Sequence, residues 1–197
     1  MGAIHWPEDR WLRWVNNLLL TVIILINGYV LVAPLLPRVD YEVKQHITKP
    51  VKVDPQKPDT IAQIDRSRNH LILPTLQLDE PVYDGQSIKT VNKGIWRRPN
   101  TSTPDKGGNT VLVGHRFTYH NAAVFYNLDK LSPNDDVYLA YGQKVYHYRV
   151  VQMAIVPPND LQVEAPSIDD RLTIYTCTPL WTSKQRLVYT ANLIEVR

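Results

Sequence analysis

The chain has 197 residues, 15 of them proline, a length that suits one folded domain with additional segments. Hydrophobic residues make up 44% of the chain, enough to form a core, so the composition excludes a wholly disordered protein. The formal net charge is only +3, which gives no indication of nucleic-acid binding.

The first element in chain order is an apolar stretch, residues 14–37, that contains no charged side chain until Arg38. A helix of twenty-odd residues spans about 30 Å, the thickness of the hydrocarbon core of a bilayer. Trp6, Trp11 and Trp14 stand at its start, as aromatic residues do at a membrane interface. The stretch therefore predicts one transmembrane helix.

A cleaved signal peptide is the competing interpretation of the same stretch. Its only suitable cleavage residue is Ala33, but Pro34 follows directly, and the bulky Leu31 occupies the position where a second small residue is needed. The apolar run is also long for a signal peptide. We therefore favour an uncleaved signal anchor.

Residues 38–59 combine five basic and four acidic side chains with three prolines, and they predict an extended linker. Only two basic residues, Arg10 and Arg13, precede the apolar stretch, and more follow it. Because basic residues favour the cytoplasmic side of a membrane, this count argues against a cytoplasmic N-terminus. A long C-terminal domain can translocate regardless of that count, so the count does not decide the orientation.

From about residue 60 to the end, short runs rich in apolar and β-branched residues alternate with turn residues. The runs that predict strands are 72–74, 76–83, 110–115, 136–141, 144–156, 172–177 and 187–196. A short helix is predicted at 122–131. About eight strands at this spacing favour a mainly β domain, 60–197, folded as a closed or nearly closed barrel with short helices.

Cys177 is the only cysteine of the chain, and it ends an alternating run just before Thr178-Pro179. A thiol at the end of a strand can be reached by a substrate and is held firmly by the sheet. A lone cysteine is also often a small buried hydrophobe. This segment alone leaves both interpretations open.

A nucleophilic thiol also needs a proton-handling partner and a group that stabilises an oxyanion. His115 ends a predicted strand, and Arg186 directly precedes the last one, where a hairpin would place it opposite Cys177. Taken alone, His115 is explained as an ordinary strand-end histidine and Arg186 as a surface charge. His120 is a second candidate histidine, but its flanks indicate a loop, and we favour His115.

At these positions the sequence resembles the sortases. Residues 173–177 read TIYTC and match the TLxTC signature of that family, with isoleucine in place of leucine. Residues 113–116, VGHR, match its strand-end histidine segment, and residues 186–188, RLV, match the arginine that opens its final strand. The order of the three segments also fits. The pair at 178–179, Thr-Pro, is most similar to classes D and E.

The resemblance implies a membrane-anchored cysteine transpeptidase with a β-barrel, usually of eight strands. Such an enzyme cleaves a C-terminal LPxTG-like signal of a secreted protein between Thr and Gly and transfers it to an amine. The acceptor would be a lipid-linked peptidoglycan precursor or a pilin lysine. Residues 1–13 would then be cytoplasmic and the catalytic barrel extracellular, and no cofactor is implied.

The resemblance also implies a role for each residue. Cys177 would be the nucleophile that forms a thioacyl intermediate, and His115 the acid and base that protonates the leaving amine and deprotonates the incoming one. Arg186 would position the signal peptide and stabilise the oxyanion. Thr176 would contribute to the same oxyanion site as a substrate-binding residue.

Two features of some sortases are not expected here. The lid of certain pilin-assembling members carries an Asp-Pro-aromatic motif, whereas Asp-Pro at 54–55 is followed by Gln56, which predicts an open groove. Other members bind calcium through loop carboxylates. Glu164, Asp169 and Asp170 lie in a suitable loop, but acidic turns are common, so we expect no metal site.

Other functions remain as alternatives. An L,D-transpeptidase would be expected to show a SHGC-like segment around its cysteine, which the flanks of Cys177 lack. A peptidase of the NlpC type places its cysteine before its histidine, whereas His115 comes first here. A third alternative is a non-catalytic, membrane-anchored barrel that only binds a partner.

Overall fold

The computed structural model describes residues 10–33, 39, 43, 64–118 and 123–197. The chain divides into two compact units, Met1–Val39 and Asp40–Arg197. The predicted linker, 38–59, lies outside the described residues apart from Val39 and Val43, and so do the Asp-Pro pair at 54–55 and His120.

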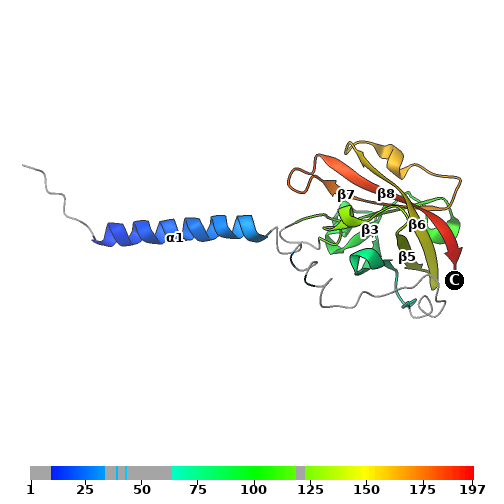
Figure 1. Ribbon diagram of the computed structural model, residues 1–197, viewed down its shortest axis with the longest axis horizontal. Helices are drawn as coiled ribbons and strands as arrows, with labels where there is room; N and C mark the ends of the chain where they lie inside the picture. The colour runs from blue at the N-terminus through cyan, green and yellow to red at the C-terminus, as the bar shows by residue number, and fades with distance from the viewer. Residues whose placement is uncertain (1–9, 34–38, 40–42, 44–63, 119–122) are drawn as a thin grey trace, which may run out of the picture. The chain divides into compact units, whose positions relative to one another are not determined.

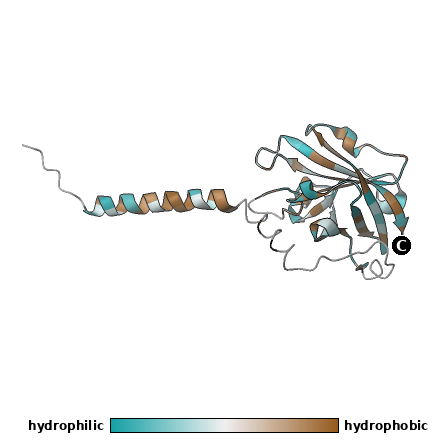
Figure 2. Cartoon of the chain, viewed as in Figure 1, coloured by the Kyte–Doolittle hydropathy of each residue, from teal (hydrophilic) through white to brown (hydrophobic). Residues whose placement is uncertain are grey.

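The first unit contains the helix α1, Arg10–Val32, which is drawn in blue in Figure 1. Its 23 residues are about 35 Å long at the usual rise of a helix. Its most apolar segment has a mean hydropathy of 2.0 and none of it is buried, and hydrophobic residues follow one another along it in Figure 2. By length and composition α1 is therefore suited to be a membrane anchor or a signal sequence.

The bounds of α1 differ from the predicted span, 14–37. The helix starts one turn earlier because residues 11–13 contain no proline or glycine, so Arg10 and Arg13 belong to its first turn. It ends at Val32 because Pro34 disfavours a helical backbone at the residue before it. Residues 34–37 of the predicted span lie outside the described residues.

The second unit is a closed β-barrel, as the sequence predicted, and it is built from eight strands of the described chain (Figure 1). These strands are β1 His70–Leu73, β2 Leu78–Asp84, β3 Ile95–Arg97, β4 Asn109–Val113, β5 Asp136–Tyr141, β6 Lys144–Val156, β7 Arg171–Thr178 and β8 Gln185–Val196. Around the barrel they follow the order β1-β2-β3-β4-β7-β8-β6-β5, with β5 pairing back to β1.

The barrel is mixed, since β2 pairs with β3 and β4 pairs with β7 in parallel, whereas the other neighbours are antiparallel. In the β4–β7 pair, Asn109 lies beside Arg171 and Val113 lies beside Tyr175. The C-terminal ends of these two strands, which precede His115 and carry Cys177, therefore meet at the same rim of the barrel.

Alternate residues of the strands point into the barrel and form its core. On β7 these are Leu172 and Ile174, and on β8 they are Leu187 and Tyr189, all at most 3% exposed. The alternate residues of β7 that point outward include Tyr175 and Cys177, which are only partly buried. The nucleophile candidate is therefore not a core residue, which removes the interpretation of Cys177 as a buried hydrophobe.

Some elements differ from the sequence prediction. The strand β3 was not predicted, because its three residues between Gly94 and Arg98 are too short to show alternation. The strand β4 ends at Val113, two residues earlier than predicted. At Gly114 the chain approaches Phe125 so closely that a Cβ atom would lie 2.6 Å from its ring, so the glycine is required there.

A helix is predicted at 122–131, but the described residues 123–131 form turns and the short 3-10 helix η5, Leu128–Lys130. Its backbone bonds join residues three apart, for example from the amide of Leu128 to the carbonyl of Phe125. The segment is short and is followed by Pro133, so it lacks the length that an α-helix needs to be stable.

Leu139 on β5 is fully buried, and we expect Leu139→Ala to lower the free energy of unfolding by about 2–5 kcal/mol, because the substitution leaves a cavity in the barrel. Chemical denaturation of the full chain in detergent measures this change. The control is Ile194→Ala on β8, where the side chain is 52% exposed and the loss should be at most about 0.5 kcal/mol. Equal losses in the two variants would contradict the assigned core.

Candidate active site

Cys177 and Arg186 lie directly opposite each other on neighbouring strands. The antiparallel register of β7 and β8 pairs these two residues, as the predicted hairpin required. Both side chains point out of the barrel, since Thr176 and Leu187 beside them point inward and are buried. The hairpin thus brings a thiol and a guanidinium to one outer surface.

His115 joins them from the neighbouring strand. It stands two residues after Val113, the last residue of β4, and Val113 pairs with Tyr175 on β7. His115, Cys177 and Arg186 line one groove with a volume of about 320 Å³. The structure therefore brings together the three residues that the sequence selected, although their chemical roles stay predictions.

The walls of this groove are mostly apolar. Its apolar lining comes from the 3-10 helix η3, Ile88–Lys93, from β3 and from the segment after β6, and the side chains are Ile88, Val91, Trp96, Pro158 and Leu161. Arg98 and Glu164 add polar groups. A groove of this size and polarity accommodates a short peptide with apolar side chains.

The imidazole of His115 is half-buried, and this burial lowers its pKa below the ordinary value of a histidine. Its Nε2 atom lies 2.9 Å from Oδ1 of Asn92, which belongs to η3. The ring therefore titrates at a lower pH than a solvated histidine and has one fixed polar neighbour. No motif in the sequence marks Asn92, which lies in a segment far from His115 along the chain.

The residues that flank His115 are bonded to the residues that flank Cys177. The buried hydroxyl of Thr176 donates a hydrogen bond of 2.8 Å to the carbonyl of Gly114. On the other side, Nη1 of Arg116 donates to the hydroxyl of Thr178 at 2.9 Å. These two bonds fix the spacing between the histidine loop and the end of β7.

The contact of Thr176 bears on its predicted role in substrate binding. Thr176 borders the groove, but it is only 1% exposed and its hydroxyl is already bonded to Gly114. Its side chain therefore positions the loop that leads to His115. The contribution of Thr176 to an oxyanion site stays a prediction.

Arg116 is held in turn by a carboxylate. Its Nη2 atom lies 2.8 Å from Oδ2 of Asp129 in η5, and the side chain of Arg116 is only 11% exposed. Because a buried guanidinium needs such a partner, Asp129 keeps Arg116 in place against Thr178. In the sequence, Arg116 stands out only as part of the histidine segment.

Arg186 is oriented by the loop before it. Its Nη1 atom donates to the carbonyls of Ser183 at 3.1 Å and of Gln185 at 3.0 Å. Within the described residues Nε and Nη2 of Arg186 make no hydrogen bond. The guanidinium is therefore anchored at one end and has donors left for an oxygen of a bound substrate.

One wall of the groove is fixed by Glu164, the last residue of the 3-10 helix η6, Leu161–Glu164. Its Oε1 atom accepts hydrogen bonds from Nε of Arg98 at 2.8 Å and from the hydroxyl of Tyr175 at 2.5 Å. Burial, followed by the bond to Glu164, raises the pKa of Tyr175 well above its ordinary value. Glu164 thus ties the wall to β7, two residues before Cys177.

The same wall is also held by the buried side chain of Asn109, which is 2% exposed. Its amide donates to the carbonyls of Val163 at 3.1 Å and of Ala165 at 2.9 Å, and its Oδ1 atom accepts from Thr173. These bonds leave the backbone after η6 little freedom. Neither Asn109 nor Glu164 was assigned this function from the sequence.

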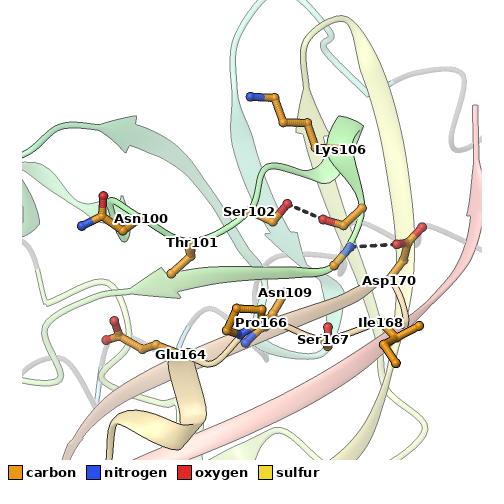
Figure 3. A pocket seen from close by; sticks show the side chains of 12 residues that line it. Asn100, Thr101, Ser102, Lys106, Asn109, Glu164, Pro166, Ser167, Ile168 and Asp170 are labelled. Carbon is orange, nitrogen blue, oxygen red and sulfur yellow. Dashed lines mark hydrogen bonds between the residues drawn. The ribbon is translucent and has the colours of Figure 1, made fainter.

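A second pocket, of about 330 Å³, lies where the loop after β3 meets the loop before β7 (Figure 3). Figure 3 shows Glu164 and Asp170 well apart, and Asp170 accepts a hydrogen bond from the amide of Gly108. The carbonyl of Asp169 accepts from Ser167. Within the described residues no three His, Cys, Asp or Glu side chains are grouped to hold a metal ion, the acidic loop included.

Comparisons with known proteins agree with this geometry. A model of the sortase domain matches residues 71–194. Sortase SrtE1 of Streptomyces coelicolor is 29% identical over 143 residues, which are 64% of this chain and 40% of the relative. Sortase D of Bacillus subtilis is 26% identical over 110 residues, which are 55% of this chain and 53% of the relative. This chain thus spans about half or less of the length of these relatives.

Solved structures share the barrel. The structure of sortase E1 from Streptomyces coelicolor with a tripeptide in its active site superposes with a TM-score of 0.58 at 26% identity, over 66% of this chain and 89% of that chain. Sortase A from Corynebacterium diphtheriae, a lid mutant, gives a TM-score of 0.60 at 26% identity, over 65% of this chain and 70% of that chain. These similarities confirm the predicted type of barrel.

We expect Thr176→Val to lower the free energy of unfolding by about 1–3 kcal/mol, because the buried carbonyl of Gly114 loses its hydrogen bond while the shape of the side chain is kept. The measurement is denaturant unfolding of the full chain. Thr190→Val on the outer face of β8 is the control and should change stability by no more than about 0.5 kcal/mol. An unchanged stability of Thr176→Val would show that the bond does not hold the histidine loop.

Proposed function

Because this chain belongs to the sortase family, we propose that it is a membrane-anchored cysteine transpeptidase that acts on LPxTG-like signals. The observation that carries the proposal is the arrangement of His115, Cys177 and Arg186 around one groove. The thiol is partly exposed, Arg186 comes from β8, and His115 comes from the loop directly after β4; β8 and β4 are the two strands that flank β7.

In the proposed first half-reaction, the thiolate of Cys177 attacks the carbonyl carbon of the threonine in the signal. A C–S bond forms, and the negative charge moves to the carbonyl oxygen, where the free donors of Arg186 stabilise it. When the oxyanion collapses, the bond to the glycine nitrogen breaks and His115 gives its proton to the leaving amine. The product is a thioester on Cys177.

The second half-reaction reverses these steps with a different amine. The incoming amine attacks the thioester carbon and loses a proton to the now neutral His115. The C–S bond breaks, the new amide leaves, and the thiolate of Cys177 is restored. The lowered pKa of His115 supports this step, because more of the ring is in the neutral form that can accept a proton than for an ordinary histidine.

The rest of the molecule supports the proposed cellular role. The apolar walls of the groove, such as Val91 and Leu161, suit the leucine and proline of an LPxTG-like signal. The helix α1 would anchor the enzyme in the membrane, with residues 1–13 cytoplasmic and the barrel outside. There it would meet secreted substrates and the amine of a lipid-linked peptidoglycan precursor or a pilin lysine. The pair Thr178-Pro179 and the names of the two curated relatives favour classes D and E.

We expect Cys177→Ala to reduce cleavage of LPxTG-like peptides at least about a thousandfold, because no other thiol in the chain can form the thioester. The assay uses the full chain in detergent, a panel of peptides varied around the threonine, and a small amine as acceptor. Mass spectrometry of the intact wild-type protein should show the acyl adduct on Cys177. Equal cleavage by the variant would refute the proposed role of Cys177 as the nucleophile, and the absence of cleavage by both proteins would favour a barrel that only binds a partner.

Arg186→Lys should lower kcat/KM about a hundredfold or more, since lysine keeps the charge but cannot offer two parallel donors to a carbonyl oxygen. The control is Lys184→Ala, which removes an exposed cation from the loop just before β8 and should retain most of the activity. The proposed oxyanion role of Arg186 is wrong if Arg186→Lys is as active as the wild type.

A further inference from the structure

Asn92 makes a hydrogen bond to the imidazole of His115, as described above, with 2.9 Å between Oδ1 of the amide and Nε2 of the ring. An amide oxygen can only accept a hydrogen bond, so Nε2 must carry a hydrogen atom. A neutral imidazole has one such hydrogen, and Nδ1 is then the nitrogen with the free lone pair. Within the described residues Nδ1 has no hydrogen-bond partner.

From this contact we propose that Asn92 is a positioning residue that holds His115 in the Nε2–H tautomer. Nδ1 is then the atom that gives a proton to the leaving amine and takes one from the incoming amine. The inference rests on the proposed transpeptidase function for these two proton transfers. The tautomer itself depends only on the hydrogen bond.

An amide is well suited to this position because it serves both charge states of the ring. Nε2 keeps its hydrogen when His115 is neutral and when it is protonated, so Asn92 accepts the same bond throughout the reaction. A carboxylate would instead favour the protonated ring and oppose the loss of its proton. Asn92 thus fixes the ring while only Nδ1 changes its protonation.

The helix that carries Asn92 is capped at both ends. Ser87 accepts a hydrogen bond from the amide of Lys89 at its start, and the amide of Gly94 donates to the carbonyl of Val91 at its end. Val91 is buried, at 7% exposure, and lines the groove. Asn92 is exposed, but its backbone therefore belongs to a fixed part of the groove wall.

No charged neighbour accounts for the titration of His115, because burial is the one cause of its lowered pKa. The titratable and charged groups around it are Tyr175 and Cys177 on β7, Arg186 on β8, Glu164 on η6, Arg98 after β3, Arg116 in its own loop, and Lys89 and Lys93 on η3. A carboxylate placed at Asn92 would be the acidic group in direct contact with the ring.

The first experiment reads the ring nitrogens of His115 by NMR. The full chain is labelled with ¹⁵N-histidine in detergent micelles, and the signals of His115 are assigned by their loss in His115→Gln. At a pH about two units above the titration midpoint, we expect Nε2 to be the protonated nitrogen in the wild type. In Asn92→Ala the shifts of both nitrogens should move toward the mixture of tautomers of a solvated histidine. Gln86→Ala, which removes an exposed amide just before η3, is the matched control and should leave the shifts unchanged.

The second experiment compares the titration with catalysis. Asn92→Asp should raise the midpoint of His115, and the limb of the pH–rate profile that reports this histidine should move by the same amount. Asn92→Ala should lower kcat about two- to tenfold with little change in KM, because the bond orients the ring and does not touch the peptide. A structural role alone would not move the pH profile.

The outcomes separate this inference from the proposed function. If Asn92→Ala leaves the ring shifts and the midpoint of His115 as in the wild type, the inference is overturned. A shift of both ring nitrogens in Asn92→Ala toward the tautomer mixture of a solvated histidine supports it even if the wild type cleaves no peptide. A wild type that cleaves no peptide would contradict only the transpeptidase proposal.

Discussion

The parallel pairing of β4 with β7 is the constraint on which the rest of the site depends. Two neighbouring strands that run in the same direction end at the same rim, so His115 after β4 and Cys177 on β7 meet there. The antiparallel return of β8 then places Arg186 opposite Cys177. Main-chain hydrogen bonds of the barrel therefore position three reactive groups that come from separate parts of the sequence.

Side-chain hydrogen bonds fix the loops and the groove wall, which the pairing of the strands does not hold by itself. The hydroxyl of Thr176 and the guanidinium of Arg116 bind the two loops to each other on both sides of the reactive pair. Glu164 and Asn109 fix the opposite wall through separate sets of hydrogen bonds. The groove is thus built before a substrate arrives, and the partly free guanidinium of Arg186 is its most available donor.

The sequence predicted the parts of this protein that repeat or stand out along the chain. Alternating strands, the apolar N-terminal stretch and the lone Cys177 carry local signals, and the barrel and the position of Arg186 followed from them. The short strand β3 has too few residues for a periodic signal, and η5 depends on contacts with the histidine loop. Asn92 and Glu164 reach the site only through the three-dimensional fold, and no spacing along the chain marks them.

The closed barrel also has a consequence for how the protein folds. Gly114 and Thr176 are bonded across 62 positions of the chain, and the β4–β7 ladder closes a loop of similar length. Pairings between such distant segments form late, since the entropy of closing the loop must first be overcome. We therefore expect the thiol of a newly made chain to lack its proposed base, His115, until folding is nearly complete, whereas the local β7–β8 hairpin can bring Arg186 opposite Cys177 earlier. Reactivity would then be acquired together with the native state, and a partly folded chain would be spared premature acyl transfer.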